Sequence, residues 1–405
     1  METIITDKIA FGGNCLAKIG GKNVFVPFAI PGETLKVEIT REKRDYSCAE
    51  IAEIIEPSPF RVKPACPLYG KCGGCNMMHI EPEFQKKLRK QILIDCLERN
   101  GITVKEDSVE VISGSSFNYR NRFQLNDGGF CERNSNCIIP VENCLCAVPE
   151  INRWFSETPF SARPKGRCHI FGSKNVFSSE GSEGGKVLFS AEETKASDNY
   201  TLLKKKNKNI RCVKKRYSGT TVSEENTIRV KILDKEISFD VKGFFQSNIE
   251  VLEKSIGAVC GGLAGTSVLD MYAGCGTFSV FLAEHFKDLT LVEHNRDALV
   301  FAEKNLMGIK HQSIGLSGAK WSESNKNALF DAVVIDPPRS GMEKEVLGWL
   351  CRSQVPQIRS VSCDPATHAR DLSALIKSGY VLKKLYLLDF YPNTSHIESL
   401  AVLEK

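Results

Sequence analysis

The chain has 405 residues, of which 42% are hydrophobic and 25% charged, and its formal net charge is +5. This length exceeds one small domain and predicts two or three, with a composition ordinary for a soluble globular protein. We expect no signal peptide and no membrane partner, because no apolar run approaches the ~18 residues that span a bilayer, and we therefore expect a cytoplasmic protein. The small positive charge permits a polyanionic partner without requiring one.

Residues 1–58 predict a small β module. Short β-branched runs are cut by Gly-Gly, Pro-Gly and charged turns, as in KIGGKNVFVPFAIPGETLKVEIT. Five short strands of this kind fit an OB-like barrel, a fold that commonly binds oligonucleotides. The pattern alone fits a purely structural barrel equally well.

Three cysteines crowd the ten residues CPLYGKCGGC, as Cys66, Cys72 and Cys75. In a reducing compartment, the sixteen cysteines of the chain should be thiols, metal ligands or nucleophiles rather than a disulfide framework. Together with a fourth ligand elsewhere, the three could hold zinc or an iron–sulfur cluster. Zinc sites usually come as two C-x-x-C pairs and only one is present, so the spacing mildly disfavours zinc.

A helix is predicted next, over EFQKKLRKQILIDCLERNGI, and the pattern ends on Asn100-Gly101. Apolar side chains recur in it at helical spacing. They are Phe84, Leu88, Ile92, Leu93 and Leu97. Residues from about 110 to 242 predict mainly strands and turns, for example FNYRNRFQL and TIRVKIL.

Basic clusters within this stretch are candidate phosphate contacts. Lys204–Lys208 and Lys214–Arg216 lie in a polar, Gly/Ser-rich segment, and Arg120 and Arg122 lie in YRNRFQL. Charge runs are usually solvated loops, so a loop is the preferred interpretation of the 204–208 run.

From about residue 245 the pattern alternates between strand and helix, which predicts a parallel, doubly wound sheet. The first strand runs into the glycine-rich turn of DMYAGCGT (270–277). Glu293 ends the next strand, where a carboxylate can bind two ribose hydroxyls. A nicotinamide enzyme would have the same geometry, but its usual G-x-G-x-x-G is absent.

The DPPR motif (336–339) ends a further strand and changes this interpretation. The glycine-rich turn, the acidic strand end and D-P-P-R together resemble an S-adenosylmethionine-dependent methyltransferase. Amino-group methylases of that fold usually carry an N-P-P-aromatic loop, whose acceptors and ring orient an NH2 group. An aspartate followed by arginine fits a different acceptor better.

A cysteine and a glutamate near the C-terminus form a candidate catalytic pair. VSCDPATHARDL places Cys363 at the end of a strand and just before a helix, whose amide dipoles would favour a thiolate. A single cysteine is usually just a small apolar residue. Glu398, in HIESLAVL, precedes a short apolar strand and could present its carboxylate to the same rim of the sheet.

At this point the chain resembles the RNA uracil-5-methyltransferase family, nearly from end to end. Five motifs stand in the order found in that family and are together very specific. They are FFQSN (244–248), DMYAGCGT (270–277), DPPRSG (336–341), SCDPATHARDL (362–372) and HIESLAVL (396–403).

The resemblance implies roles for individual residues. Cys363 matches the nucleophile and Glu398 the general base. The matching cofactor or substrate binders are Gln246, Tyr272, Thr277, Glu293 and Asp336. Two positions depart from the family: Thr277 stands where some relatives have Asn, and Asp364 replaces a commoner Asn beside the nucleophile, where it could raise the pKa of the thiol.

The resemblance also implies S-adenosylmethionine as the cofactor and a [4Fe–4S] cluster with a structural or RNA-positioning role. Its fourth ligand would be Cys144 in IIPVENCLC, with Cys146 as the second choice. The implied substrate is a uridine of 23S rRNA, because relatives that methylate the tRNA T-loop commonly lack both barrel and cluster. A tRNA substrate and a non-catalytic RNA-binding factor are the alternatives, and no obligate protein partner is evident.

The predicted fold class is therefore α/β. A TRAM or OB-like barrel is expected at 1–58, and a β-rich central domain with the cysteines and RNA-binding surfaces at 59–242. A Rossmann-like methyltransferase domain is expected at 243–405.

Overall fold

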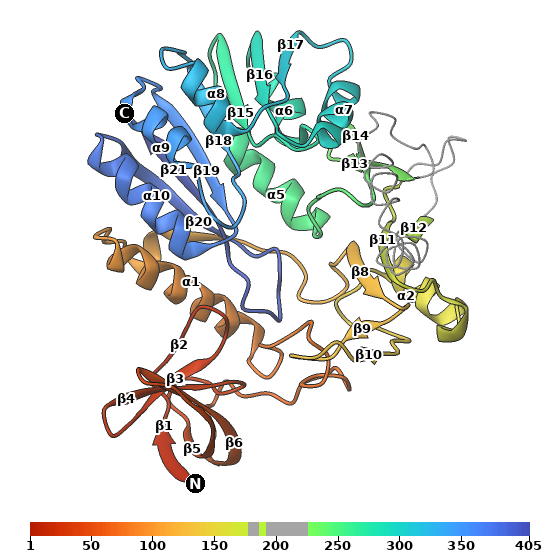
Figure 1. Cartoon of the computed structure of the whole chain (residues 1–405), viewed down its shortest axis with the longest axis vertical. Helices are drawn as coiled ribbons and strands as arrows, with labels where there is room; N and C mark the ends of the chain where they lie inside the picture. Colours follow the sequence, from red (N-terminus) through yellow and green to blue (C-terminus); the bar gives the residue numbers. More distant parts are fainter. Residues whose placement is uncertain (177–185, 192–225) are drawn as a thin grey trace, which may run out of the picture.

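The structure is a computed structural model, and it describes residues 1–176, 186–191 and 226–405 (Figure 1). The basic runs Lys204–Lys208 and Lys214–Arg216 lie outside these residues, so their roles stay predictions.

Six strands, one more than expected, form the N-terminal β module at the bottom of Figure 1. They are β1 (Glu2–Ile5), β2 (Lys8–Ile9), β3 (Cys15–Ile19), β4 (Lys22–Val26), β5 (Thr34–Glu42) and β6 (Tyr46–Glu56). The sheet order is β1-β5-β6-β4-β3-β2, and only β4 and β6 pair in parallel. The sheet curls so that β1 also contacts β3, and alternate side chains such as Leu35 and Val37 fill the interior.

The centre of the chain is rich in short antiparallel strands, on the right of Figure 1. They are β8 (Arg122–Asn126), β9 (Phe130–Cys131), β10 (Ile138–Ile139), β11 (Arg167–Ser173), β12 (Lys186–Ala191), β13 (Thr227–Ile232) and β14 (Lys235–Asp240). Two 3-10 turns occur at Glu106–Ser108 and Phe160–Ala162. One α-helix here was not predicted, α2 (Pro149–Glu157). Pro149 starts this helix, and Ile151 and Phe155 bury one face of it, which is too short a pattern to separate from a strand.

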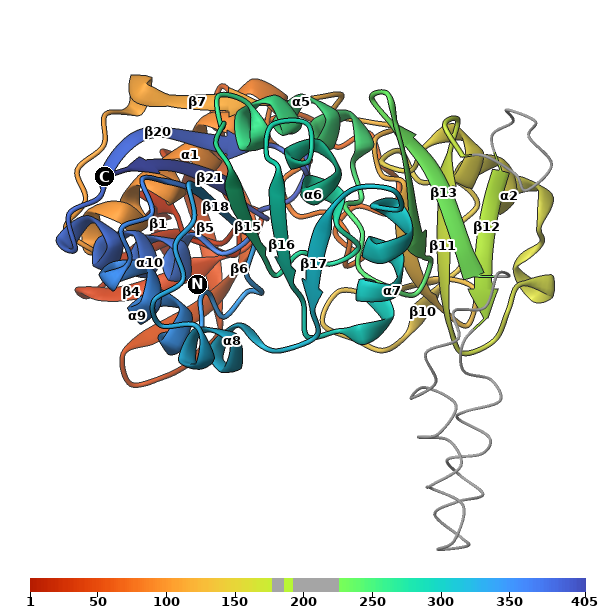
Figure 2. The ribbon, with the colours of Figure 1, turned by 90° about the horizontal axis from the view of Figure 1, so that it is seen from above.

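The largest sheet has eight strands in the order β17-β16-β15-β18-β19-β21-β20-β7 (Figure 2). They are β7 (Val109–Ile112), β15 (Ser267–Met271), β16 (Asp288–Val292), β17 (His311–Ile314), β18 (Ala332–Ile335), β19 (Gln357–Ser362), β20 (Val381–Leu388) and β21 (Glu398–Glu404). All pairs are parallel except those of β21, which runs antiparallel to both β19 and β20. The expected strand–helix alternation and the α/β fold class are confirmed.

Helices cover both faces of this sheet. Val268 of β15 belongs to one buried apolar cluster and Leu269 and Met271 to another, as alternation along a strand requires. The first cluster includes α5 (Ile249–Cys260), α6 (Thr277–Leu282) and α7 (Arg296–Asn305). The second includes α1 (Pro82–Arg99), α8 (Gly318–Ser324), α9 (Lys344–Arg352) and α10 (Pro365–Lys377).

Helix α1 has the extent that its sequence predicted. The Glu81 side chain caps its first amides, Asn100 is its C-cap, and Gly101 follows in the left-handed region at φ 79°. The helix packs against α10 and β20, and β7 extends the sheet beyond β20. Residues 82–112 therefore belong with the eight-stranded sheet and its helices, although they precede the central strands in sequence.

Candidate active site and cysteine-lined pocket

One edge of the large sheet gathers most of the predicted site residues. Tyr272 follows β15, Glu293 follows β16, Asp336 follows β18 and Cys363 follows β19. These four strands are parallel, so their carboxyl ends meet at the same edge, the usual ligand-binding edge of such sheets.

Glu398 reaches this edge because β21 runs the other way. In the antiparallel register Ser399 lies opposite Ser362, which places the first residue of β21 beside the residue that follows β19. Glu398 and Cys363 lie close enough to interact electrostatically. Gln246 Nε2 donates to Glu398 Oε1 at 3.3 Å, and both side chains are buried. The fold thus brings the predicted nucleophile, the predicted base and Gln246 together.

The glycine-rich turn is built around Glu293. Its carboxylate accepts from the backbone N–H of Gly274 at 2.9 Å and from that of Asn295 at 2.6 Å. Gly276 has φ 77°, and a Cβ there would lie 3.2 Å from Ala302 Cβ, so both backbone conformation and space favour glycine. A buried carboxylate beside an open glycine turn fits the ribose of a nucleoside cofactor.

Two other predicted binders have partners within the protein. The Tyr272 hydroxyl donates to Glu343 Oε2 at 3.2 Å, and the same oxygen accepts from the backbone N–H of Ala319. Thr277 is the first residue of α6, and its hydroxyl lies 3.4 Å from Cys275 Sγ. Contacts of Tyr272 and Thr277 with a cofactor stay predictions.

Three carboxyl groups lie at this edge, with Asp270 and Glu398 buried and Asp336 half-buried, and desolvation raises the pKa of each. The pKa of Asp336 rises because of desolvation, and that of Glu398 rises because of burial and the neighbouring charge of Asp336. The pKa of Asp270, which accepts from the Ser279 hydroxyl at 2.5 Å, is raised to about 7, chiefly by burial. Asp270 opens the DMYAGCGT motif but was not among the predicted site residues.

The thiol of Cys363 is kept neutral in this structure. Burial raises its pKa to about 11, and the carboxylates of Glu398 and Asp336 add to the rise. This direction is opposite to the predicted stabilisation of a thiolate by the helix amides. Asp364 instead caps α10 by accepting from the backbone N–H groups of Ala366 and Thr367.

Three further side chains at this site were not predicted as site residues. Tyr391 is close enough to Glu398 and Cys363 to interact with both, and burial raises its pKa to about 12. The ring of His396 lies 5.6 Å from that of Tyr391, edge to face. The guanidinium of Arg120, predicted only as a phosphate contact, lies 6.0 Å from the Tyr391 ring. The segment DFYPNTSH before Glu398 was the only sequence signal for Tyr391 and His396.

The loop that carries Tyr391 and His396 is anchored to α1. Arg89 forms a buried ion pair with Asp389 at 2.7 Å and donates to the carbonyl of Thr394 at 3.0 Å. Asn393 has φ 66°, and its backbone N–H donates to Gln85 Oε1 at 2.9 Å. Breaking such a buried pair costs about 3–5 kcal/mol, so the approach to Glu398 is rigidly held.

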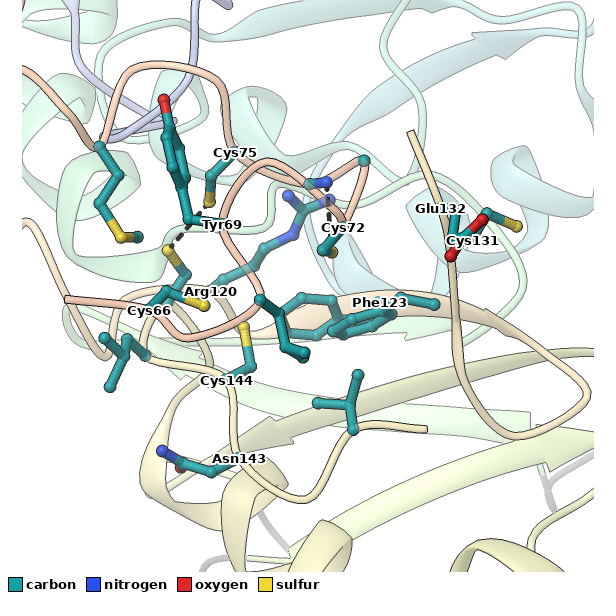
Figure 3. A pocket seen from close by; sticks show the side chains of 18 of the residues that line it. Cys66, Tyr69, Cys72, Cys75, Arg120, Phe123, Cys131, Glu132, Asn143 and Cys144 are labelled. Atoms are coloured by element: carbon teal, nitrogen blue, oxygen red, sulfur yellow. Dashed lines mark hydrogen bonds between the residues drawn. The ribbon is translucent and has the colours of Figure 1, made fainter. Parts of the chain in front are cut away.

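The clustered cysteines line a cavity of about 450 Å³ (Figure 3). Cys66, Cys72, Cys75 and Cys144 face the same space, and Cys146 joins them through a 3.7 Å contact of its Sγ with that of Cys75. Cys131 also lines the cavity but accepts from Asn126 Nδ2 at 3.1 Å. No disulfide bond joins cysteines in the described part of the chain.

Two of the thiols that line the cavity, those of Cys72 and Cys144, have a raised pKa. Burial raises the pKa of Cys72, and a hydrogen bond with the Cys146 thiol raises that of Cys144. Within the described ranges, no three His, Cys, Asp or Glu side chains converge as the ligands of one metal ion do. A four-iron cluster binds each cysteine to a different iron, so its ligands surround a volume instead of a point. Cysteines around a cavity fit that requirement.

No helix in the described ranges is long and apolar enough to cross a lipid bilayer.

Family models match two parts of the chain. Residues 191–405 match the model described as tRNA (uracil-5-)-methyltransferase. Residues 1–60 match the model of the TRAM domain of tRNA (uracil(54)-C(5))-methyltransferase.

Similar proteins span the whole chain. An RNA methyltransferase of Treponema denticola, described as uncharacterized, is 35% identical over 100% of this chain and 99% of its own. The 23S rRNA (uracil(1939)-C(5))-methyltransferase RlmD of Shewanella amazonensis is 28% identical over 97% of this chain and 93% of its own. The crystal structure of Pyrococcus abyssi tRNA (uracil-54, C5)-methyltransferase with S-adenosyl-L-homocysteine superposes with a TM-score of 0.69, at 20% identity, over 99% of this chain and 100% of that one.

Proposed function

The chain belongs to the RNA uracil-5-methyltransferase family, and we propose that it methylates carbon 5 of a uridine in 23S rRNA through a covalent bond between Cys363 and the base. The observation that carries the proposal is the meeting of Cys363, Glu398 and Gln246 at the carboxyl edge of the sheet.

The chemistry of uracil explains why a thiol and a carboxylate are needed together. Carbon 5 is a poor nucleophile until Cys363 Sγ, after losing its proton, forms a bond to carbon 6 and pushes electrons toward carbon 5. Once carbon 5 has taken the methyl group, Glu398 removes the proton from that carbon. The electron pair left behind re-forms the ring double bond and expels the Cys363 thiolate.

S-adenosylmethionine, when bound, supplies a methyl group on a positively charged sulfonium. Glu293 beside the glycine turn would hold its ribose. The carboxyl groups of Asp270 and Asp336, whose pKa values are raised by desolvation, fit a cationic ligand, because a positive charge nearby favours their ionised form. The target uridine must leave its stack to reach Cys363, as in other enzymes that act on a base.

The choice between rRNA and tRNA rests on the relatives in sequence. RlmD proteins match nearly the whole chain, which supports 23S rRNA. The expectation that a barrel and a cluster together argue against tRNA loses the support of the barrel. The matching TRAM model is that of a tRNA enzyme, and the tRNA enzyme of Pyrococcus abyssi shares the full fold. Methylation of a tRNA uridine is therefore the second candidate.

We further propose that the cysteine-lined pocket holds a [4Fe–4S] cluster, bound by Cys66, Cys72, Cys75 and Cys144. Cys146 is the alternative fourth ligand, because its Sγ lies 3.7 Å from that of Cys75. Uracil methylation needs no electron, so the cluster would have a structural role.

Mapping of 5-methyluridine in rRNA and tRNA from a strain that lacks the gene tests the substrate. We expect one position of 23S rRNA to lose its methyl group and the purified protein to restore it. Loss at a tRNA position alone would establish the second candidate, and no loss in either RNA would refute both.

A further inference from the structure

A polar cavity of about 370 Å³ lies next to the cysteine-lined pocket and is separate from the catalytic residues. Five segments line it: two loops of the N-terminal sheet, the turn that contains Cys75, the hairpin between β9 and β10, and the loop before Glu398. We call it the junction cavity.

The junction cavity is built from close contacts between these segments. Asn76 Nδ2 donates to the carbonyl of Gly12 at 3.1 Å and to Ser395 Oγ at 2.9 Å, and Asn76 Oδ1 accepts from the Ser395 N–H. A Cβ at Gly13 would lie 2.5 Å from Asn76 Nδ2, so no other residue fits there without displacement. The N-terminal sheet is thereby fastened directly to the loop that leads to the catalytic base.

The side chains around the junction cavity suit one kind of ligand. No acidic residue lines it, whereas Arg133, His396 and several asparagines do. In the described part of the chain, no carboxylate lies within ion-pair distance of Arg133. Cationic and amide donors without a competing carboxylate fit a phosphate and the polar edge of a base.

An aromatic residue in an unusual backbone conformation supports Arg133. Phe28 has φ 60°, which is rare for a bulky side chain and typically persists where the surrounding structure or a function requires it. Its ring packs at an angle to that of Tyr69, and the Arg133 guanidinium lies 4.4 Å from the ring centroid. The guanidinium is thus held beside Phe28 at the cavity, and a guanidinium group can stack on a base.

His396 lines the junction cavity and lies against Tyr391, which interacts with Cys363 and Glu398. His396 and Tyr391 therefore link the cavity to Cys363 and Glu398. We infer that the junction cavity binds a nucleotide of the same RNA that flanks the target uridine, with Arg133 stacking on its base or pairing with its phosphate. This inference rests on the proposed function for the nature of the polymer.

The test measures binding as well as methylation. The probe is the shortest synthetic RNA that the protein methylates, with an abasic site placed in turn at each position flanking the target. The variants are Arg133→Ala, Arg133→Lys and Phe28→Gly, which tolerates φ 60°. The control is Arg352→Ala, an exposed arginine at the end of α9 and away from the cavity.

We expect Arg133→Ala and Phe28→Gly to raise the Kd for the intact RNA by about 5- to 150-fold, the range for loss of one stacked base, with kcat at saturating RNA unchanged. Arg133→Lys should retain only part of the RNA affinity, because lysine keeps the positive charge but lacks the planar guanidinium group. One flanking abasic site should weaken binding of the unmodified protein by the same factor and have no effect on Arg133→Ala.

The inference is overturned if the cavity variants bind RNA as tightly as Arg352→Ala does. It is also overturned if every abasic site weakens RNA binding by the cavity variants as much as it weakens RNA binding by the unmodified protein. Arg133-dependent binding of 23S rRNA without methylation of any RNA would support the cavity and refute the proposed function instead.

Discussion

The candidate active site and the cysteine-lined pocket both contain reactive groups whose pKa is raised by burial, as Cys363 and Cys72 show, but they are built differently. Cys363 directly follows β19 and Glu398 begins β21, so one continuous sheet sets the positions of both. Five cysteines of the pocket lie in the segments 66–75 and 144–146, outside the named strands and helices, whereas Cys131 ends β9. Paired strands fix positions in the sheet, whereas a cluster bound in the pocket would hold its turns together. We therefore expect substitutions in the candidate active site to change the reaction rate, and substitutions in the cysteine-lined pocket to change stability.

We expect the largest effect from Cys363→Ala, which should abolish the reaction and leave stability unchanged. Methyl transfer should fall by more than about 10⁴-fold, since removal of a nucleophile leaves only binding and positioning. Affinity for S-adenosylhomocysteine and the free energy of unfolding should stay the same. Radiolabelled methyl transfer, calorimetric titration and urea unfolding measure these, with Cys351→Ala, another half-buried thiol, as the control. Substantial turnover by Cys363→Ala would remove the covalent mechanism.

Glu398→Gln should slow methylation by about 10²–10⁴-fold, the usual contribution of a general base. Because addition and alkylation do not need the base, a protein–RNA adduct should accumulate and survive a denaturing gel. If methylation stops and no adduct appears, Glu398 acts by positioning, through its contact with Gln246.

Damage to the pocket should have the reverse pattern. The purified protein is expected to contain about four iron atoms. Cys66→Ser or Cys144→Ser should lose them and unfold at lower denaturant, because metal binding contributes to folding. Affinity for S-adenosylhomocysteine should not change.

Cys137→Ser, exposed and outside the pocket, is the matched control for these variants. One zinc ion in place of iron would contradict the cluster. Loss of iron from Cys146→Ser but not from Cys144→Ser would show that Cys146, and not Cys144, is the fourth ligand.

The smallest effect concerns pH. The pKa of Glu398 is raised in the folded protein. Between the pKa of the unfolded chain and that of the folded protein, the folded protein therefore keeps a proton that the unfolded chain has released. The free energy of unfolding consequently falls as pH rises through this range. Glu398→Gln removes that penalty. We expect it to stabilise the protein by on the order of 1 kcal/mol at pH 8, and by nothing near pH 4.

Thermal unfolding at the two pH values measures this difference. If Glu398→Gln changes stability equally at both pH values, the effect comes from packing and not from the proton. The kcat/KM of the unmodified protein should fall toward acid pH, with a midpoint above the usual pKa of glutamate.

Sequence by itself determined the features that depend on near neighbours. The extent of α1 followed from apolar spacing and its Asn100-Gly101 end, and the alternation after residue 245 followed from strand and helix periods. Parallel strands share an edge, so Glu293, Asp336 and Cys363 could be placed together from their positions after strands.

Only the tertiary structure decided what depends on long-range pairing and burial. The antiparallel register of β21 brings Glu398 beside Cys363, and β7 joins the sheet from far upstream in sequence. The direction of the Cys363 pKa shift likewise depends on which carboxylates the fold turns toward the thiol. Local sequence patterns contain neither register nor burial, because both are set by contacts between segments far apart in the chain.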